Sequence, residues 1–357
     1  MPETVLVAMS GGVDSSLAAA LLVEQGYRVI GATMKTFCYS EMPGPSRTCC
    51  GLEGIQDARR VCDRLGIPHH VFDMEEAFTR DVIDDFVREY AAGRTPNPCV
   101  RCNSNTKIPD LLRKGRMLGA DRIATGHYAR RVVGPGGSVR IRRGADPAKD
   151  QSYFLWGIPR EVLGALLFPV GELTKPEVRA RARALGLATA DKPESQEICF
   201  VPTGDYGDLL AARLGADHPA LAPGRTVTSR GEVIGEHRGY ARYTVGQRKG
   251  LGGGFRQPLY VLGVRPERNE VVVGTADELN RSDVVLGDLN WLDSAPSEGE
   301  RVHVQVRHRA AAVPAVVTAV GAAELELRLD VPQRAITPGQ SGVLYRGDVL
   351  VGGGRIQ

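Results

Sequence analysis

The sequence lacks any long apolar run: in its 357 residues, no stretch approaches the ~20 apolar residues that a membrane-spanning helix needs. A marked excess of one charge is also missing, because 45 lysines and arginines stand against 42 acidic residues, a net charge of +3. The first four residues lead directly into an apolar stretch and contain no signal peptide. We therefore expect a cytoplasmic protein that does not associate with membranes, and the overall charge does not indicate a nucleic-acid partner.

Cysteine is absent after position 199. The seven cysteines are odd in number and stand at positions 38, 49, 50, 62, 99, 102 and 199. In a chain without an export signal they are better interpreted as thiols or metal ligands than as a disulfide framework. Cys62 falls on the apolar face of a predicted helix and is expected in the core, whereas the pattern assigns no role to Cys49 and Cys50.

Two common nucleotide-binding fingerprints are missing as well. Neither the Walker sequence GxxxxGK[ST], with its phosphate-binding lysine, nor the dinucleotide sequence GxGxxG follows the first apolar run. Instead, apolar residues 5–9 are followed by a Ser/Gly loop over 10–16 and by apolar, helix-forming residues 17–22. This order is typical of a strand, an anion-binding loop and a helix whose first N–H groups face the anion.

Strands and helices alternate in the first two hundred residues. Strands are predicted at 28–34, 70–73 and 121–125, and helices at 54–65, 75–90, 103–118 and 175–185. This alternation predicts an α/β fold with a doubly wound parallel sheet, in which ligands bind beyond the carboxyl ends of the strands. Beyond residue 204, alternating Val/Thr/Arg segments between Gly/Pro turns predict a β-rich half. We divide the chain into a catalytic domain over 1–204, a small linking β-rich domain over 205–280 and a C-terminal β-barrel-like domain over 281–357.

A segment with two prolines carries two of the cysteines. The prolines in Thr95–Asn103 hold the backbone extended, so we predict a rigid loop that presents Cys99 and Cys102. Residues 130–143 predict a basic hairpin. Residues 238–256 place five basic residues among tyrosines without an acidic residue, which suits a phosphate backbone with stacked bases. A solvated cationic face would show the same pattern.

The loop Ser10-Gly11-Gly12-Val13-Asp14-Ser15 resembles the SGGxDS signature of the PP-loop ATP pyrophosphatases, whose fold is adenine nucleotide alpha hydrolase-like. That resemblance implies an enzyme that splits ATP between the α and β phosphates, forms an adenylate on a substrate oxygen and releases pyrophosphate. It further implies that the serines and glycines of the loop hold pyrophosphate and that Asp14 lies near a bound Mg²⁺.

Four more stretches, at 95–103, 146–154, 195–200 and 243–250, make nearly the whole chain similar to the bacterial tRNA-specific 2-thiouridylases. The resemblance implies a sulfurtransferase that adenylates the C2 oxygen of uridine 34 in tRNA and then replaces it with sulfur. The ATP contacts that it implies are Ala8, Met9, Ser10, Gly11, Gly12, Val13, Asp14, Ser15, Met34 and Gly126. The implied contacts with the target base or the tRNA are Asn97, Pro98, Cys99, His127, Lys149, Asp150, Gln151, Arg307, His308 and Gln340.

The same resemblance assigns chemistry to two cysteines. Cys199 would carry a persulfide, loaded by a persulfide-donating sulfur carrier or a cysteine desulfurase relay, and Cys102 would be the nucleophile that releases the product by forming a disulfide. Cys99 departs from the family pattern, because many relatives carry Asp there. Together, Cys99, Cys102 and Cys199 have the ligand number of a [4Fe–4S] cluster, which related thiolases hold with three cysteines. The persulfide and the cluster mechanism both stay open at this point.

Two other classes of protein fit part of the pattern. Another PP-loop enzyme, such as an amidotransferase-type ligase or a lysidine synthetase, does not call for paired cysteines and would keep its turnover in a Cys102→Ala variant. A non-catalytic RNA-binding protein with a structural metal site would release no pyrophosphate when a tRNA with uridine 34 is added.

Overall fold

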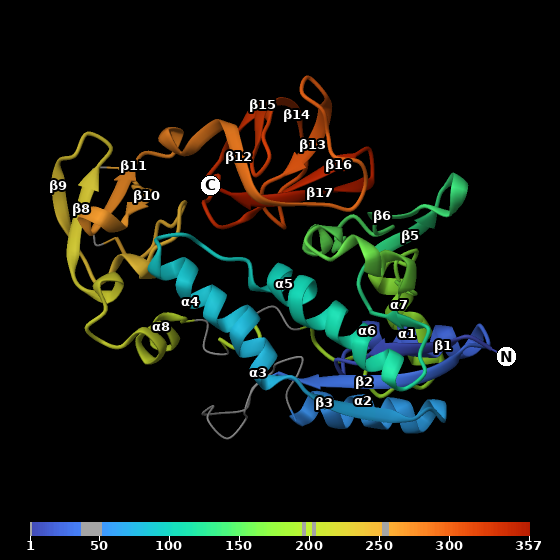
Figure 1. Cartoon of the computed structure of the whole chain (residues 1–357). Helices are drawn as coiled ribbons and strands as arrows, with labels where there is room; N and C mark the ends of the chain where they lie inside the picture. Colours follow the sequence, from blue (N-terminus) through green and yellow to red (C-terminus); the bar gives the residue numbers. More distant parts are fainter. Residues whose placement is uncertain (1, 37–51, 195–197, 202–204, 252–256) are drawn as a thin grey trace.

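The computed structural model describes the whole chain except residues 1, 37–51, 195–197, 202–204 and 252–256 (Figure 1). Three groups of residues singled out in the sequence therefore lie outside the described residues: Cys38, Cys49 and Cys50, the first three residues of the 195–200 stretch, and the last part of the basic segment 238–256. No helix in the described part of the chain is long and apolar enough to cross a membrane.

Five parallel strands form the first sheet, in the order β3-β2-β1-β4-β7. The strands are β1 (Thr4–Ala8), β2 (Arg28–Lys35), β3 (His69–Asp73), β4 (Arg122–Ala124) and β7 (Leu166–Leu167). The chain builds outward from β1 to β3 and then crosses to β4 on the other side of β1. The carboxyl ends of β1 and β4 therefore form the switch point at which open α/β sheets bind ligands.

Helices cover both faces of this sheet, which explains why Val5, Leu6 and Val7 of β1 are all apolar and buried. Val5 and Val7 are buried with α1 (Val13–Glu24), α2 (Leu52–Leu65) and α7 (Lys175–Ala184) in one apolar cluster. Leu6, between them, points to the opposite face and packs with α6 (Ile108–Met117). The alternation of side chains along a strand thus separates two cores. The predicted doubly wound parallel sheet is confirmed.

The β-rich half predicted beyond residue 204 is confirmed too, and it forms two sheets (Figure 1). The smaller sheet has the order β10-β11-β8-β9 and consists of β8 (Gly224–Thr228), β9 (Val233–His237), β10 (Tyr260–Arg265) and β11 (Glu270–Gly274). The larger sheet closes into a barrel because β12 pairs with both β15 and β17. Its strands are β12 (Asn280–Trp291), β13 (Arg301–Gln305), β14 (Val313–Val320), β15 (Leu325–Arg334), β16 (Ser341–Arg346) and β17 (Val349–Ile356). The domain limits at 204/205 and 280/281 stay a prediction.

Two elements differ from the expectation, one in this half and one before it. A short helix, α8 (Gly207–Leu214), precedes the strands. The basic hairpin is present as β5 (Ala129–Val133) and β6 (Val139–Arg143), but β6 pairs with β17 and so extends the barrel sheet rather than the parallel one. The hairpin at 129–143 and the C-terminal barrel therefore share one sheet.

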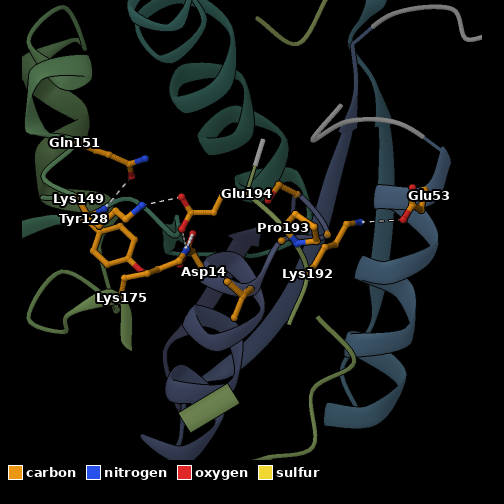
Figure 2. A pocket seen from close by; sticks show the side chains of 13 residues that line it. Asp14, Glu53, Tyr128, Lys149, Gln151, Lys175, Lys192, Pro193 and Glu194 are labelled. Atoms are coloured by element: carbon orange, nitrogen blue, oxygen red, sulfur yellow. Dashed lines mark hydrogen bonds and ion pairs between the residues drawn. The ribbon is translucent and has the colours of Figure 1, made fainter. Parts of the chain in front are cut away.

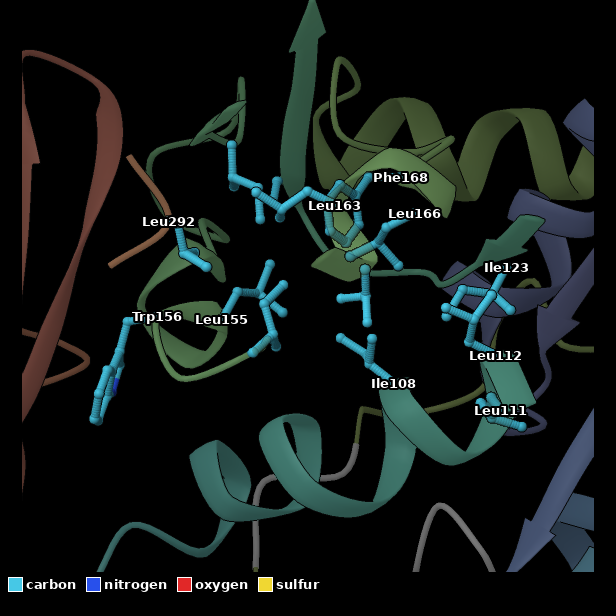
Figure 3. Packing of buried hydrophobic residues seen from close by; sticks show 14 of the residues in the cluster. Ile108, Leu111, Leu112, Ile123, Leu155, Trp156, Leu163, Leu166, Phe168 and Leu292 are labelled. Carbon is cyan, nitrogen blue, oxygen red and sulfur yellow. The ribbon is translucent and has the colours of Figure 1, made fainter. Parts of the chain in front are cut away.

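One buried apolar cluster connects the parallel sheet with the barrel (Figure 3). Ile108 and Ile123 contribute from α6 and β4, Leu155 and Trp156 from the middle of the chain, and Leu292 from the segment after β12. Because these residues exclude water jointly, the barrel is fixed to the parallel-sheet part of the molecule.

The rigid loop predicted for Cys99 and Cys102 is wrong. Pro98 begins a helix, α5 (Pro98–Arg101), and Cys102 opens a π-helical turn (Cys102–Lys107) that continues into α6. Proline is suited to a first helical position, and the Asn97 side chain accepts a hydrogen bond from Val100 N at 3.4 Å as the N-cap. A similar π-helical turn (Thr79–Ile83) joins α3 (Glu75–Phe78) to α4 (Asp84–Ala91) within the predicted helix 75–90.

Candidate functional site

The Ser/Gly loop follows β1 and is closed by its own hydroxyl groups. Ser10 N donates to Ser15 Oγ at 3.1 Å, and Ser15 Oγ donates to the Gly12 carbonyl at 3.1 Å. Gly12 is the N-cap of α1 and makes no side-chain capping bond. The N–H groups of the first turn of α1 thus have no side-chain cap, which leaves a positive helix end at the switch point.

Two glycines allow the loop to lie between its neighbours. Gly11 has φ +71°, and a Cβ added there would lie 2.7 Å from Gly54 Cα on α2. A Cβ added to Gly126, just after β4, would lie 2.7 Å from Ser15 N. The close approach of backbone to backbone therefore depends on the absence of side chains at these two positions.

Two adjoining cavities meet at this loop. The first, about 190 Å³, lies at the ends of β1 and β4, and its lining includes Ala8, Met9, Ser10, Asp14, Ser15, Met34, Lys107, Gly126, His127 and Gln151. The second, about 470 Å³, is lined by Ser10, Gly11, Gly12, Val13, Asp14, Glu53, Tyr128, Lys149, Gln151, Lys175, Lys192, Pro193 and Glu194 (Figure 2). Every residue for which the sequence implied an ATP contact lines one cavity or the other.

The larger cavity contains a network of opposite charges around Asp14. Lys175 Nζ lies 2.8 Å from both carboxylate oxygens of Asp14 and 2.9 Å from Glu194 Oε1. Lys149 Nζ donates to Glu194 Oε2 at 2.7 Å. Burial opposes ionisation of Glu194, but the hydrogen bonds from the two lysines outweigh it and lower its pKa to about 2. Glu194 is therefore a carboxylate at any physiological pH.

Tyr128 completes the contacts of Asp14. Its hydroxyl donates to Asp14 Oδ1 at 2.6 Å. Burial, and then the hydrogen bond to this carboxylate, raise the pKa of the phenol well above its usual range, so it stays a donor. The carboxylate of Asp14 is thus held in one orientation from two sides.

The cysteines occupy different environments. Cys62 is fully buried, and burial raises the pKa of its thiol to about 12, as expected for a core residue. Cys99 is exposed, whereas Cys102 and Cys199 are half-buried. Both half-buried cysteines pack against the same apolar cluster, which includes Phe78, Phe86 and Phe200. In the described ranges, no three or more His, Cys, Asp or Glu side chains are grouped as a metal site.

Several residues expected at the tRNA or its target base gather around the start of α5. Gln340 Nε2 donates to the carbonyls of Thr95 and Pro96, at 3.1 and 2.8 Å. The ring of His308 lies 4.3 Å from that of Phe154 between centroids. The Gln340 hydrogen bonds bring the barrel against the segment that carries Cys99. Pro98 in this segment is buried.

Other residues expected to contact tRNA already have partners within the chain. Asp150 accepts hydrogen bonds from Gly144 N and Ser152 N and pairs with Arg143 at 2.8 Å. Arg307 Nη2 donates to the Arg334 carbonyl at 2.8 Å. These residues therefore stabilise turns and strand ends, and their contact with tRNA stays a prediction.

The sequence analysis missed Lys175, Tyr128 and Glu194. Lys175 stands at the start of a predicted helix, where a lysine carries no local signal. Tyr128 and Glu194 are adjacent to residues that were singled out, His127 and the 195–200 stretch. Only the juxtaposition of the ends of β1, β4 and α7 shows that these side chains share one cavity.

Comparison with known families covers nearly the whole chain. The family described as "tRNA methyl transferase HUP domain" matches residues 3–203, "tRNA methyl transferase PRC-barrel domain" matches 216–275, and "Aminomethyltransferase beta-barrel domain" matches 281–356. The chain is 50% identical over 360 residues to the tRNA-specific 2-thiouridylase MnmA of Carboxydothermus hydrogenoformans, covering 99% of this chain and 98% of the relative. It is 49% identical to the protein of the same name from Geobacter metallireducens, covering 99% and 96%.

Solved structures show a more distant likeness. A 4-thiouridine synthetase–RNA complex with bound ATP has a TM-score of 0.36 and 13% identity over 60% of this chain and 51% of that one. The NMN synthetase of Francisella tularensis has a TM-score of 0.35 and 17% identity over 54% and 66%.

Proposed function

The chain belongs to the family of tRNA-specific 2-thiouridylases, and we propose that its two cavities activate a tRNA uridine with ATP so that a cysteine-borne sulfur can replace the C2 oxygen. The protein is therefore a tRNA sulfurtransferase. The observation that carries the proposed mechanism is the convergence of Cys102 and Cys199, from segments far apart in the sequence, on one apolar cluster.

Adenylation is assigned to the loop and its cavities. The smaller cavity, between Met34 and Gly126, would take the adenosine, and the uncapped start of α1 would take phosphate oxygens. The uridine O2 attacks the α-phosphorus, the bond from that phosphorus to the β-bridging oxygen breaks, and pyrophosphate leaves with the electron pair. Mg²⁺ usually binds one or two carboxylates together with substrate phosphates, and the Asp14 carboxylate is suited to that part. When bound, Mg²⁺ would neutralise the phosphate charge.

Sulfur transfer is assigned to the two half-buried cysteines. The terminal sulfur of a Cys199 persulfide attacks C2, and AMP leaves with the electron pair of the C2–O bond. The Cys102 thiolate then attacks Cys199 Sγ, which forms a Cys102–Cys199 disulfide and releases the thiocarbonyl of 2-thiouridine. A thiol reductant must supply two electrons before the next turnover, and a persulfide donor must reload Cys199.

The described residues do not favour the alternative with a [4Fe–4S] cluster. Cys99 is exposed while Cys102 and Cys199 are half-buried, and the three do not form a metal-ligand group in the described part of the chain. We therefore assign no step to a cluster. Cys99 is instead proposed to lie beside the target base, together with Asn97.

The tRNA substrate is proposed to carry uridine 34 and to lie across the start of α5 and the adjacent barrel. Gln340 approaches this segment from the barrel side, and His308 packs on Phe154. A cytoplasmic location, where tRNA is modified, belongs to the same proposal.

Single-turnover assays with a uridine-34 tRNA, ATP and a persulfide donor test this function. Cys199→Ser should still release pyrophosphate but form no 2-thiouridine, because it adenylates without a sulfur to deliver. Cys102→Ser should leave the tRNA attached to Cys199 through a disulfide, visible as a shift in mass. Asp14→Ala should form no AMP.

Cys62→Ala is the matched control. Because Cys62 is a core residue, this variant should thiolate tRNA at nearly the wild-type rate. The proposal fails if Cys102→Ser and Cys199→Ser both form 2-thiouridine as fast as Cys62→Ala.

A further inference from the structure

The chain between α4 and α5 is held from two sides just before it reaches Cys99 (Figure 1). Residues 94–97 belong to no helix or strand. Thr95 N donates to the carbonyl of Pro338, between β15 and β16 of the barrel, at 2.8 Å. Thr95 Oγ1 donates at 3.3 Å to Thr244 Oγ1, between β9 and β10 of the smaller sheet. The conformation of this segment therefore depends on partners that are distant in the sequence.

The side chain of Gln340 uses both hydrogens of its amide on the same segment. Nε2 donates to the carbonyls of Thr95 and Pro96, at 3.1 and 2.8 Å. A carbonyl oxygen only accepts hydrogen bonds, so the amide nitrogen and not the amide oxygen must face these groups. Gln340 is itself fixed to the barrel, because its own carbonyl accepts from Ile356 N of β17 at 2.8 Å. The side chain can thus offer a bound RNA only Oε1, an acceptor that does not bind phosphate.

This segment sets the start of the helix that carries Cys99. Asn97 Oδ1 accepts from Val100 N at 3.4 Å as the N-cap of α5. Cys102 follows directly, as the first residue of the π-helical turn. A helix as short as α5 has little stability of its own. The positions of both cysteines therefore follow from the place at which residues 95–97 are fixed.

We propose that Gln340 is a positioning residue for thiolation, which holds residues 95–97 so that α5 presents its cysteines to the target base and to the persulfide. This inference rests on the proposed function, because it takes the roles of these cysteines from it. Misplacing a reacting group by about 1 Å can lower a rate by about two orders of magnitude. Two hydrogen bonds that fix the start of α5 can therefore control the rate without contacting the substrate.

A role for Gln340 in binding tRNA has different consequences. If Gln340 acted on RNA through Oε1, its loss would raise the tRNA concentration at half saturation and leave the tRNA-free protein unchanged. Gln340→Glu, which keeps an acceptor oxygen at that place, would then retain more function than Gln340→Met. A positioning role instead predicts that both variants differ from the wild type before any RNA is added, because at neutral pH both lack the two donors.

Hydrogen–deuterium exchange of the full chain without tRNA is the first test. In Gln340→Met and Gln340→Glu, exchange over residues 95–102 should increase by about 10- to 100-fold, the range that two hydrogen bonds between neutral groups contribute. The second test is single-turnover thiolation of Gln340→Met at saturating tRNA and ATP, whose rate should fall at least ~10-fold. The tRNA concentration at half saturation and the affinity for ATP should stay within about 2-fold, which a general loss of structure would not allow.

Gln333→Met is the matched control. The amide of Gln333 donates to the carbonyls of Val331 and Pro332 in its own strand, both at 3.3 Å, so this variant should leave exchange over 95–102 and the thiolation rate unchanged. Thr244→Val removes the contact with Thr95 from the opposite side. It should raise exchange in the same segment by a smaller factor, and it tests the proposal independently of any misfolding caused by substitutions at Gln340.

The proposal is overturned if Gln340→Met exchanges residues 95–102 as the wild type does, if Gln340→Glu retains wild-type exchange, or if only the tRNA concentration at half saturation changes. Exchange is measured without tRNA, ATP or a persulfide donor, so a failure of the thiolation mechanism would leave it unchanged. A wild-type protein that forms no 2-thiouridine would contradict the proposed function, whereas unchanged exchange in Gln340→Met would contradict only the positioning role.

Discussion

His127, at the carboxyl end of β4, is held neutral by its surroundings. Its Nδ1 and Thr125 Oγ1 are hydrogen-bonded at 2.8 Å. Burial, and then the charge of Lys107, lower the pKa of the imidazole from 6.5 to about 3. Any contact of His127 with a ligand at neutral pH is therefore a hydrogen bond of the uncharged ring.

This lowered pKa makes the fold sensitive to mild acid. Below pH 6.5 the unfolded chain takes up the proton before the folded chain does, so stability is lost as the pH falls from 6.5 toward 3. At pH 5 we expect a loss of about 1–2 kcal/mol from this group. In thermal unfolding at pH 7.5 and pH 5, His127→Asn should lose less stability between the two conditions than the wild type. Equal losses in both proteins would contradict the assignment.

Asp14 and Lys175 show how far individual residues of the site could be predicted. Asp14 belongs to a contiguous motif next to a strand, so its place at the switch point follows from local sequence. Lys175 makes its essential contacts with a residue 161 positions away, and nothing in its neighbourhood distinguishes it from the other cations of its helix. Residues whose role arises from long-range contacts become visible only in the folded chain.

The junction between α1 and α2 depends on two facing glycines. Gly11 approaches the backbone of Gly54, and its φ of +71° is itself unfavourable for other residues. Gly26, which follows α1, has a similar φ of +83° but nothing within 4 Å of an added Cβ.

Comparing Gly11→Ala with Gly26→Ala therefore separates the cost of a left-handed backbone from the cost of a steric clash between the loop and α2. Gly26→Ala should cost about 1–2 kcal/mol, the price of the left-handed backbone alone, and should bind ATP normally. Gly11→Ala should cost more and bind ATP at least ~10-fold more weakly, since the loop must move away from α2. Unfolding midpoints measure the stability of each variant, and calorimetry measures its affinity for ATP. The interpretation fails if the two variants behave alike.

The helix around Cys99 and Cys102 shows why element boundaries were harder to predict. The prolines at 96 and 98 correctly excluded a helix through both positions, but Pro98 is compatible with a helix that starts there. The π-helical turn after Arg101 has no signature in the sequence. The turn packs against the other π-helical turn, Thr79–Ile83, and against Ser152–Leu155, which are distant in the sequence.

Arg355, near the end of β17, connects the barrel to α4. Its side chain is 14% exposed and lies 2.6 Å from Glu89 and 3.3 Å from Asp85, which are almost fully buried. Asp85 also pairs with Arg101 at 3.3 Å, and Glu89 with Arg94 at 2.6 Å. The charge network therefore runs from the barrel through α4 to the residue before Cys102.

Arg355→Met should loosen this connection. The substitution removes one cation from two buried carboxylates. Breaking a buried ion pair costs about 3–5 kcal/mol of the free energy of unfolding. We expect a loss near the lower end, because each carboxylate keeps another arginine partner. Hydrogen–deuterium exchange should increase in both α4 and β17. Arg328→Met, which breaks the Arg328–Asp283 pair with side chains 69% and 72% exposed, is the control and should cost under ~1 kcal/mol. Unchanged exchange in α4 would show that the barrel is held by apolar contacts alone.

The overall architecture was predicted well where it depends on periodicity and less well where distant segments pair. The parallel sheet follows from apolar strands that alternate with amphipathic helices, and the β-rich half follows from segments in which apolar and polar residues alternate. That β6 would join β17 could not be predicted, because Arg142 and Val349 carry no shared pattern and lie far apart in the sequence.

This pairing sets an order of events during synthesis. The hairpin β5–β6 leaves the ribosome long before its partner, since Arg142 and Val349 are separated by 207 positions (349 − 142). At about 5–20 residues per second, the exposed edge of β6 waits roughly 10–40 s for β17. The nucleotide-binding half is thus translated and able to fold while one strand of its own hairpin is still unmatched, and a chaperone that shields this edge would improve the yield of the native protein.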